Sequence, residues 1–224
     1  MTAREAALRM VECCRHLAGR GLIAGADGNL SVRLGPDRAL VTPTGLIKAL
    51  LRPSDMVEVD LAGRKRRGRR NPTSELDLHL RILRRRRDVG AVVHAHPPAA
   101  TGFATAGLEL DTFALPEFIF QVGRAPLVPY ATPGTPALGD RIEPFLADHD
   151  ALLLANHGAV TLGRTLDEAW IRMESLEHAA RILWTARTLG EGGGRGGRRV
   201  TPLTHEAVEQ LRALRARAQR EKDA

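Results

Sequence analysis

The sequence is poor in cysteine and in aromatic side chains, and it has no long apolar run. Its two cysteines, Cys13 and Cys14, are adjacent, and neighbours in sequence make a poor disulfide, which excludes a disulfide framework. No apolar run approaches the roughly 18 residues that a membrane-spanning helix needs. The N-terminal segment carries acidic residues and lacks the apolar stretch of a secretory signal, so we expect a cytoplasmic protein with no membrane partner.

Acidic residues are fewer than basic residues, 26 against 33. The 224 residues carry a formal net charge of +7, and arginine supplies almost all of the excess. The basic clusters at residues 64–70, 84–87 and 195–199 fall in apparent turns, at a helix end and in a glycine-rich segment. Aromatic side chains, the stacking platforms for bases, make up only 4% of the chain. We therefore predict solvated surface arginine and no nucleic-acid partner, with an anionic partner as the alternative.

Hydrophobic periodicity predicts an α/β protein in which strands and helices mix without strict alternation. Helices are expected over residues 3–20, 72–88, 97–107, 116–122, 135–149 and 165–190. A hairpin is expected over 29–43, and further strands over 56–63, 91–96, 125–130, 151–158 and 159–163. This order predicts a central mixed sheet with helices on both faces. We expect a catalytic domain over residues 1–190, a Gly/Arg-rich linker over 191–199 and a loosely attached amphipathic helix over 200–224.

The segment AVVHAH places two histidines in an otherwise buried strand. His94 and His96 point to the same face, about 7 Å apart, and can converge on one metal ion. Core packing explains a lone pair of this kind equally well, but His157, at the end of another apolar strand, can supply a third ligand. Three histidines with an open position are typical of catalytic metal sites. The other histidines are predicted to be surface or packing residues: His16, His79, His149, His178 and His205.

The segment NPTSE, residues 71–75, precedes a predicted helix. Thr73 and Ser74 lie where the first helical turn leaves backbone N–H groups free, and hydroxyls beside free amides bind anions such as phosphate. An ordinary helix N-cap is the alternative interpretation. Two glycine-containing turns, GADGN and TPTG, can also present amides to a phosphate group.

These motifs occur together and in a fixed order: G-x-x-x-G-x-x-G-N-x-S near residue 30, TPTG at 42–45, PTSE at 72–75, H-x-H at 94–96, PYATPGT at 129–135 and NHG at 156–158. The combination resembles the class II aldolase/adducin family, and in particular its L-fuculose-1-phosphate aldolase members. The resemblance implies a three-layer α/β/α sandwich with a mixed, largely antiparallel sheet. It also implies a homotetramer with active sites at subunit interfaces.

The resemblance further implies a zinc ion held by His94, His96 and His157, with Glu75 beside it as the acid/base. The residues that match the family's phosphate-binding positions are Gly28, Asn29, Thr44, Gly45, Thr73 and Ser74. The implied reaction is cleavage of a ketose 1-phosphate to dihydroxyacetone phosphate and an aldehyde. The alternatives are a pentulose-5-phosphate 4-epimerase, a sugar-acid-phosphate decarboxylase, a methylthioribulose-phosphate dehydratase and a non-catalytic adducin-like module.

The sequence departs from the family pattern at a tyrosine that acts on the departing aldehyde. An ungapped count back from PYAT places this tyrosine at Leu115. The one ionisable candidate in this segment is Glu117, in the apolar context LPEFIF. We predict that desolvation raises the pKa of Glu117 and suits it to general acid–base work. Tyr130 is the second candidate, and it is expected in a packed turn.

Overall fold

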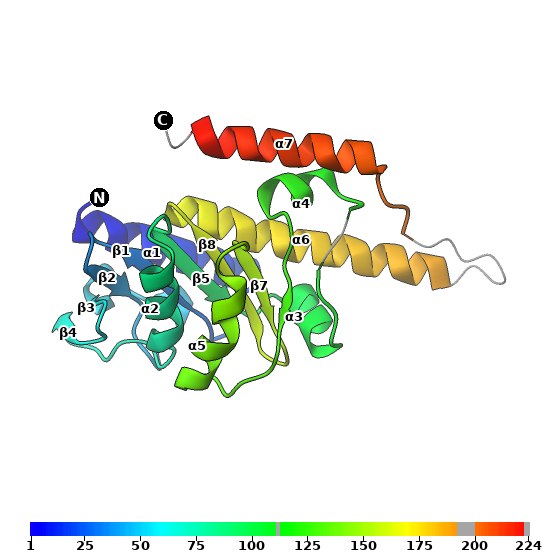
Figure 1. Cartoon of the computed structure of the whole chain (residues 1–224). Coiled ribbons are helices and arrows are strands. Elements are labelled where there is room, and N and C mark those ends of the chain that lie inside the picture. Colours follow the sequence, from blue (N-terminus) through cyan, green and yellow to red (C-terminus); the bar gives the residue numbers. More distant parts are fainter. Residues whose placement is uncertain (111–112, 192–199, 222–224) are drawn as a thin grey trace.

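The computed structural model describes residues 1–110, 113–191 and 200–221, and a single sheet forms its centre (Figure 1). The strands are β1 (Asn29–Arg33), β2 (Arg38–Val41), β3 (Val57–Asp60), β4 (Lys65–Arg67), β5 (Ala91–Ala95), β6 (Leu127–Val128), β7 (Ala151–Leu154) and β8 (Gly158–Gly163). Their order in the sheet is β4-β3-β2-β1-β5-β8-β7-β6. Among the described strands only β6 and β7 pair in parallel, and β5 lies in the middle, between β1 and β8.

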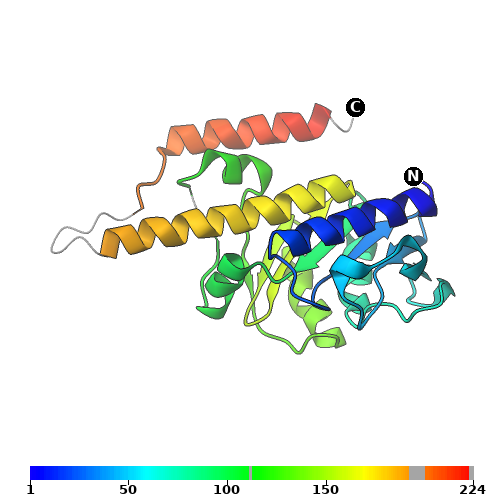
Figure 2. The same ribbon diagram turned by 180° about the vertical axis from the view of Figure 1, so that it is seen from behind.

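Helices cover both faces of this sheet. They are α1 (Ala3–Gly19), α2 (Leu76–Arg85), α3 (Pro98–Thr105), α4 (Pro116–Gln121), α5 (Pro136–Ile142), α6 (Leu166–Glu191) and α7 (His205–Glu221). α1, α3 and α6 pack on one face, and α2 and α5 pack on the other. Figure 2 shows α1 and α6 crossing the first face side by side. The predicted three-layer α/β/α sandwich with a mixed, largely antiparallel sheet is therefore confirmed.

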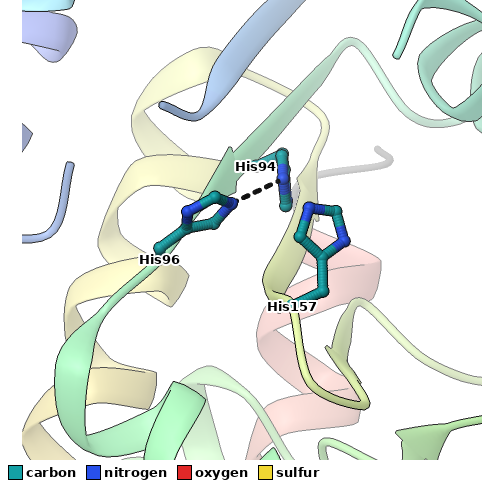
Figure 3. A group of neighbouring side chains, drawn as sticks. All are labelled: His94, His96 and His157. Atoms are coloured by element: carbon teal, nitrogen blue, oxygen red, sulfur yellow. Dashed lines mark hydrogen bonds between the residues drawn. The ribbon is translucent and has the colours of Figure 1, made fainter. Parts of the chain in front are cut away.

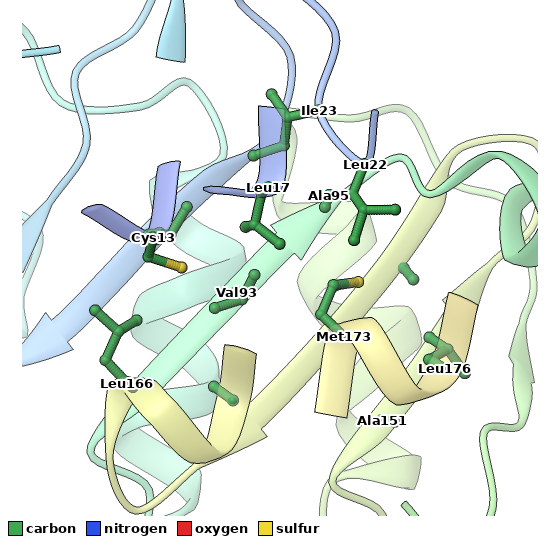
Figure 4. Packing of buried hydrophobic residues seen from close by; sticks show 14 of the residues in the cluster. Cys13, Leu17, Leu22, Ile23, Val93, Ala95, Ala151, Leu166, Met173 and Leu176 are labelled. Atoms are coloured by element: carbon green, nitrogen blue, oxygen red, sulfur yellow. The ribbon is translucent and has the colours of Figure 1, made fainter. Parts of the chain in front are cut away.

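A hydrophobic core lies on each face of the sheet, and β5 contributes to both. Val93 and Ala95 face the core under α1, α3 and α6, where Figure 4 shows them among side chains of these layers. Val92 faces the core under α2 and α5. Burial of a valine side chain such as Val92 or Val93 contributes about 1.5–3 kcal/mol. His94 shares the face of Val92, so its ring points toward the side of the sheet that carries α2.

Most of the predicted elements are confirmed, with corrections to their extent. The helix predicted over residues 135–149 ends at Ile142, and a 3-10 turn that contains Pro144 follows it. Proline has no N–H group to continue the α-helical hydrogen bonds. The strand predicted over 125–130 shrinks to the two residues of β6. β4 is a short strand within the segment for which a polar turn is predicted.

The C-terminal helix α7 lies along α4 (Figure 1). Val208 is its buried hydrophobic residue, and the guanidinium of Arg215 bonds to the carboxylate of Asp150 at 3.1 Å. The predicted linker begins at Glu191, which ends α6, and its residues 192–199 lie outside the described part of the chain. None of the described helices is long and apolar enough to span a membrane.

Candidate metal and phosphate site

Three histidines meet where the central strand β5 ends and its neighbour β8 begins (Figure 3). His94 lies in β5, His96 follows the end of β5, and His157 directly precedes β8. Because β5 and β8 are neighbours, the two strand ends bring the three rings together. The ring centroids are 4.7–5.1 Å apart, and one ligand nitrogen of each ring lies within 4.8 Å of the other two. The three predicted metal ligands therefore form one cluster.

The NHG turn that presents His157 has a tightly constrained backbone. Asn156 has a φ of 55°, and it is the only described residue other than glycine with a positive φ. Asparagine tolerates this left-handed conformation better than most residues. A Cβ atom at Gly158 would lie 2.6 Å from both the Ala95 carbonyl oxygen and the His96 ring. The turn thus needs a glycine where β8 meets the end of β5.

Electron-rich atoms face one another at the centre of the cluster. The Nδ1–H group of His94 donates to the Ala159 carbonyl at 2.9 Å, which directs its Nε2 atom inward. This Nε2 atom lies 3.2 Å from Nε2 of His96 and 3.1 Å from Oε2 of Glu75. Such contacts between atoms with lone pairs require a proton or a metal ion between them. Ligand nitrogens of a tetrahedral zinc ion lie roughly 3.3 Å apart, which matches the spacing of the two imidazoles.

Two of the three histidines also have the protonation state that a metal ion requires of its ligands. Burial, reinforced by the neighbouring His94, lowers the pKa of His157 to about 4. Burial likewise lowers the pKa of His96, so both rings are neutral near pH 7 and keep a lone pair. Oε1 of Glu75 and Nδ1 of His157 are buried without a hydrogen-bond partner. The residues present therefore fit a divalent cation.

Glu75 lies directly beside this cluster. Its carboxylate is 8% exposed at the start of α2, with Oε1 3.5 Å from Nε2 of His157. The Asn29 side-chain amide donates to Oε2 at 2.8 Å. Burial alone would raise the pKa of Glu75, but His94 and the Asn29 hydrogen bond outweigh burial and hold this pKa below its usual range. The carboxylate is therefore ionised and able to accept a proton.

A chain of buried hydrogen bonds fixes the orientation of the Asn29 amide that binds Glu75. His79 is fully buried, its Nε2 atom lies 2.5 Å from Oδ1 of Asn29, and its Nδ1 atom lies 2.8 Å from the Ser31 hydroxyl. Since Asn29 donates its N–H to Glu75, its Oδ1 accepts from His79, and Ser31 then donates to Nδ1. Burial, reinforced by His94, lowers the pKa of His79 to about 3, so this ring is neutral.

From the sequence, His79 is predicted to be a surface or packing residue, and its role behind Glu75 is not predicted. Two residue spacings in the sequence indicate that His79 can reach the residues around Glu75. His79 lies four residues after Glu75, on the same face of α2. Asn29 and Ser31 are two residues apart in β1, so their side chains share one face.

Backbone hydrogen bonds join the three segments of the predicted phosphate site. The Thr42 N–H donates to the Leu30 carbonyl at 3.0 Å, and the Thr73 N–H donates to the Thr42 carbonyl at 3.0 Å. The Thr44 N–H donates to the Asn71 carbonyl at 3.2 Å. We call the six residues on these joined segments the cradle: Gly28, Asn29, Thr44, Gly45, Thr73 and Ser74.

The cradle is open toward solvent and continuous with the histidine cluster. Thr44, Gly45 and Ser74 are exposed. Gly28 has a φ of 69°, and a Cβ atom there would lie 2.8 Å from the His94 carbonyl oxygen. The backbone of the cradle therefore packs directly on the strand that carries the metal ligands.

The alternative interpretation, in which Thr73 or Ser74 is an ordinary N-cap of α2, is wrong. α2 begins at Leu76, and its N-cap residue Glu75 makes no side-chain cap bond. Thr73 instead accepts a hydrogen bond from the Glu75 N–H at 3.3 Å, in the turn before the helix. The hydroxyl of the exposed Ser74 is thus not used as a helix cap.

The predicted apolar burial of Glu117 is also wrong, because this side chain is exposed on α4. Gln121, at the end of α4, accepts a hydrogen bond from Arg172, whose guanidinium also donates to the Leu162 carbonyl. Leu162 lies near the end of β8 that is remote from His157. Within one chain, the fold therefore does not bring Glu117 to the histidine cluster.

Tyr130, in contrast, lies in the segment that borders the site. It follows β6, and β6 pairs in parallel with β7, which leads directly to His157. Further along the segment, a Cβ atom at Gly134 would lie 3.3 Å from the Ser74 carbonyl oxygen. Tyr130 is 55% exposed rather than packed in a turn.

This fold and site define a protein in which three histidines, a ligand set that fits a divalent metal ion, lie beside an ionised carboxylate. Comparison with known proteins gives the family. The family model of the class II aldolase and adducin N-terminal domain matches residues 8–184, and the chain belongs to this family.

Its relatives include aldolases that act on sugar phosphates. The chain is 38% identical over 193 residues to 5-methylthioribulose-1-phosphate/5-deoxyribulose-1-phosphate aldolase of Rhodospirillum rubrum, covering 85% of this chain and 86% of the relative. It is 36% identical over 174 residues to L-fuculose phosphate aldolase of Methanocaldococcus jannaschii, covering 78% of this chain and 93% of the relative. The structure of Escherichia coli YgbL, whose description names aldolase, epimerase and decarboxylase as candidate activities, has a TM-score of 0.84 at 31% identity, covering 94% of this chain and 99% of YgbL.

Proposed function

We propose that the chain is a zinc-dependent aldolase that cleaves a ketose 1-phosphate into dihydroxyacetone phosphate and an aldehyde. The observation that carries this proposal is the position of Glu75, whose carboxylate lies between the histidine cluster and the Asn29 amide, next to the cradle. The names of two relatives, both aldolases of sugar phosphates, support it. On the family resemblance we also propose a homotetramer with active sites at subunit interfaces.

The residues of the chain would bind and orient the substrate and move one proton. The bound metal ion would supply a Lewis acid that stabilises negative charge on substrate oxygens as the carbon–carbon bond breaks. The cradle would hold the phosphate group and thereby fix the position of the bond to be broken. Glu75, kept ionised and oriented by Asn29, would accept the proton that the C4 hydroxyl gives up through the second acid/base and pass it to the carbon at which the bond breaks.

A substrate panel tests the proposal. The zinc-loaded protein would be incubated with L-fuculose 1-phosphate, 5-deoxyribulose 1-phosphate, methylthioribulose 1-phosphate, a pentulose 5-phosphate and a 3-oxotetronate 4-phosphate. We expect dihydroxyacetone phosphate from at least one ketose 1-phosphate. Turnover of the pentulose 5-phosphate alone would replace the aldolase by an epimerase, and absence of any turnover by metal-loaded, folded protein would refute an enzymatic role on sugar phosphates.

A sugar-acid-phosphate decarboxylase is the second candidate, and the missing tyrosine favours it. Among the described residues, Glu75 and the exposed Asp27 are the carboxylates within ion-pair distance of the histidine cluster. Aldol cleavage needs an acid or base near the C4 hydroxyl, whereas decarboxylation releases CO₂ and needs no proton transfer there. In the panel, release of CO₂ from the 3-oxotetronate 4-phosphate identifies this activity.

Replacing Ser74 with alanine is expected to weaken binding of phosphorylated substrates by about 1–3 kcal/mol, because a charge-assisted hydrogen bond to phosphate is lost. The effect should appear in KM for the phosphorylated substrate. Ser175→Ala, a half-buried position on α6, is the matched control and should leave KM unchanged. Equal activity of the parent protein on phosphorylated and unphosphorylated sugars would exclude a phosphate site in the cradle.

The two candidates for the second acid/base give a paired prediction. Because Tyr130 is exposed in the segment that borders the site, we propose it as the second acid/base, and Tyr130→Phe is then expected to lower kcat on the best substrate by about tenfold or more. The role of Glu117 remains a proposal, and it requires that Glu117 reach the site of a neighbouring subunit. Steady-state kinetics of Glu117→Gln decides this point: a large loss of kcat with normal zinc content would support a role across the interface, and unchanged kinetics would exclude Glu117.

A further inference from the structure

Lys48 is a buried cation that the proposed reaction does not use. It begins a 3-10 turn (Lys48–Leu50) after the TPTG segment, and its side chain is one of the largest that are fully enclosed, at 2% exposure. No described carboxylate lies within 4.0 Å of its ammonium group. Burial of an ammonium group without a carboxylate partner is unfavourable, so a group that balances this charge is expected nearby.

The contacts of Lys48 place its charge between two turns of the cradle. Its ammonium group donates to the carbonyl of Ala26 at 2.6 Å and to the carbonyl of Leu46 at 3.1 Å. Its backbone N–H donates to the Gly25 carbonyl at 2.9 Å. Ala26 is two residues from Gly28, and Leu46 directly follows Gly45. The Lys48 side chain therefore bridges the GADGN turn and the end of the TPTG turn from the buried side.

Two bonds to carbonyl groups do not by themselves require a full positive charge. They leave the charge of Lys48 without a counter-ion next to amides and hydroxyls that face solvent. The nearby acid is Asp27, which is exposed and directed toward His96 at a distance of 3.6 Å. An anion bound in the cradle would balance the charge at short range in a poorly solvated place, where electrostatic attraction is strong.

We propose that Lys48 is the buried counter-charge of the cradle, which attracts a phosphate group and holds the two turns in the shape that binds it. This inference rests on the proposed phosphate site and adds to it a residue that does not touch the substrate. Because Lys48 acts on the phosphate group and not on the reacting carbon atoms, its loss should raise KM far more than it lowers kcat.

Lysine-selective labelling tests the proposal on the unmodified protein. The sequence contains lysine only at positions 48, 65 and 222, so side-chain ¹⁵N labelling gives three signals. Titration with inorganic phosphate is expected to shift the Lys48 signal saturably, in step with the backbone amides of Gly28 and Gly45. Shifted amides with an unmoved Lys48 signal would overturn the proposal while leaving the phosphate site intact. If the amides do not move either, the phosphate site fails and the proposal fails with it.

Substitution gives a second test with a matched control. Lys48→Met keeps the length of the side chain and removes its charge. Lys65→Met removes the same charge from an exposed position on β4, where the ammonium group bonds only to the Arg70 carbonyl. We expect the dissociation constant for inorganic phosphate to rise about tenfold or more in Lys48→Met and less than about twofold in Lys65→Met, with equal zinc content. A folded Lys48→Met protein that binds phosphate as tightly as the parent would refute the proposal. If this variant does not fold, the titration of the parent protein decides.

Discussion

Replacing His94 with alanine is expected to abolish metal binding and catalysis together. His94 contributes the central imidazole of the cluster, since its Nε2 atom faces both His96 and Glu75. With two histidines left, the site loses a ligand and the geometry that a divalent ion needs. Elemental analysis of protein purified without a chelator or metal-binding tag should give about one metal ion per parent chain and close to none in the variant. Activity should fall to background.

The controls separate loss of the metal from loss of the fold. His178→Ala changes an exposed histidine on α6 and should retain metal and activity. His94 is fully buried in a central strand, so its replacement can also disturb folding. His157→Ala changes a residue in the turn between β7 and β8 and provides an independent test of the same site. Chelation of the parent should remove activity, and added Zn²⁺ should restore it. A parent protein that contains no divalent metal and binds none when it is added would disprove the metal site.

Replacing Glu75 with glutamine is expected to lower kcat by about 10²- to 10⁴-fold while the metal ion is retained. Glutamine has nearly the same shape, and its carbonyl oxygen can still accept the hydrogen bond from Asn29. It cannot accept a proton, so the loss falls on the chemical step and not on binding. Steady-state kinetics with parallel metal analysis measures both quantities.

Glu58→Gln is the matched control for Glu75→Gln. Glu58 is also a buried carboxylate, at 7% exposure, but it lies on β3 and pairs with Arg38 away from the histidines. This variant should lose some stability and keep its kcat. If Glu75→Gln instead turns over the best substrate of the panel within about threefold of the parent, another group must transfer the proton.

The structure also explains why the second acid/base could not be chosen from the sequence. The segment LPEFIF is apolar, and its composition predicts a desolvated carboxylate at Glu117. In the fold, Phe118 and Ile119 take the buried face of α4, and Glu117 takes the exposed face. The composition of a six-residue window does not tell which side of a short helix a residue occupies. That choice is made by α6 and α7, which pack against α4.

The sequence by itself predicted the three histidines that the fold brings together, the order of most of the elements and the family. These features are local: alternation along a strand puts His94 and His96 on one face, and the motifs keep their spacing whatever surrounds them. Only the tertiary structure decided which local features act together. The Asn29–Glu75 hydrogen bond joins residues 46 positions apart, and the ammonium of Lys48 reaches back 22 positions to Ala26. Such contacts depend on the pairing of strands and on the side chains buried between layers, because a buried polar group must find its partner wherever the fold places one.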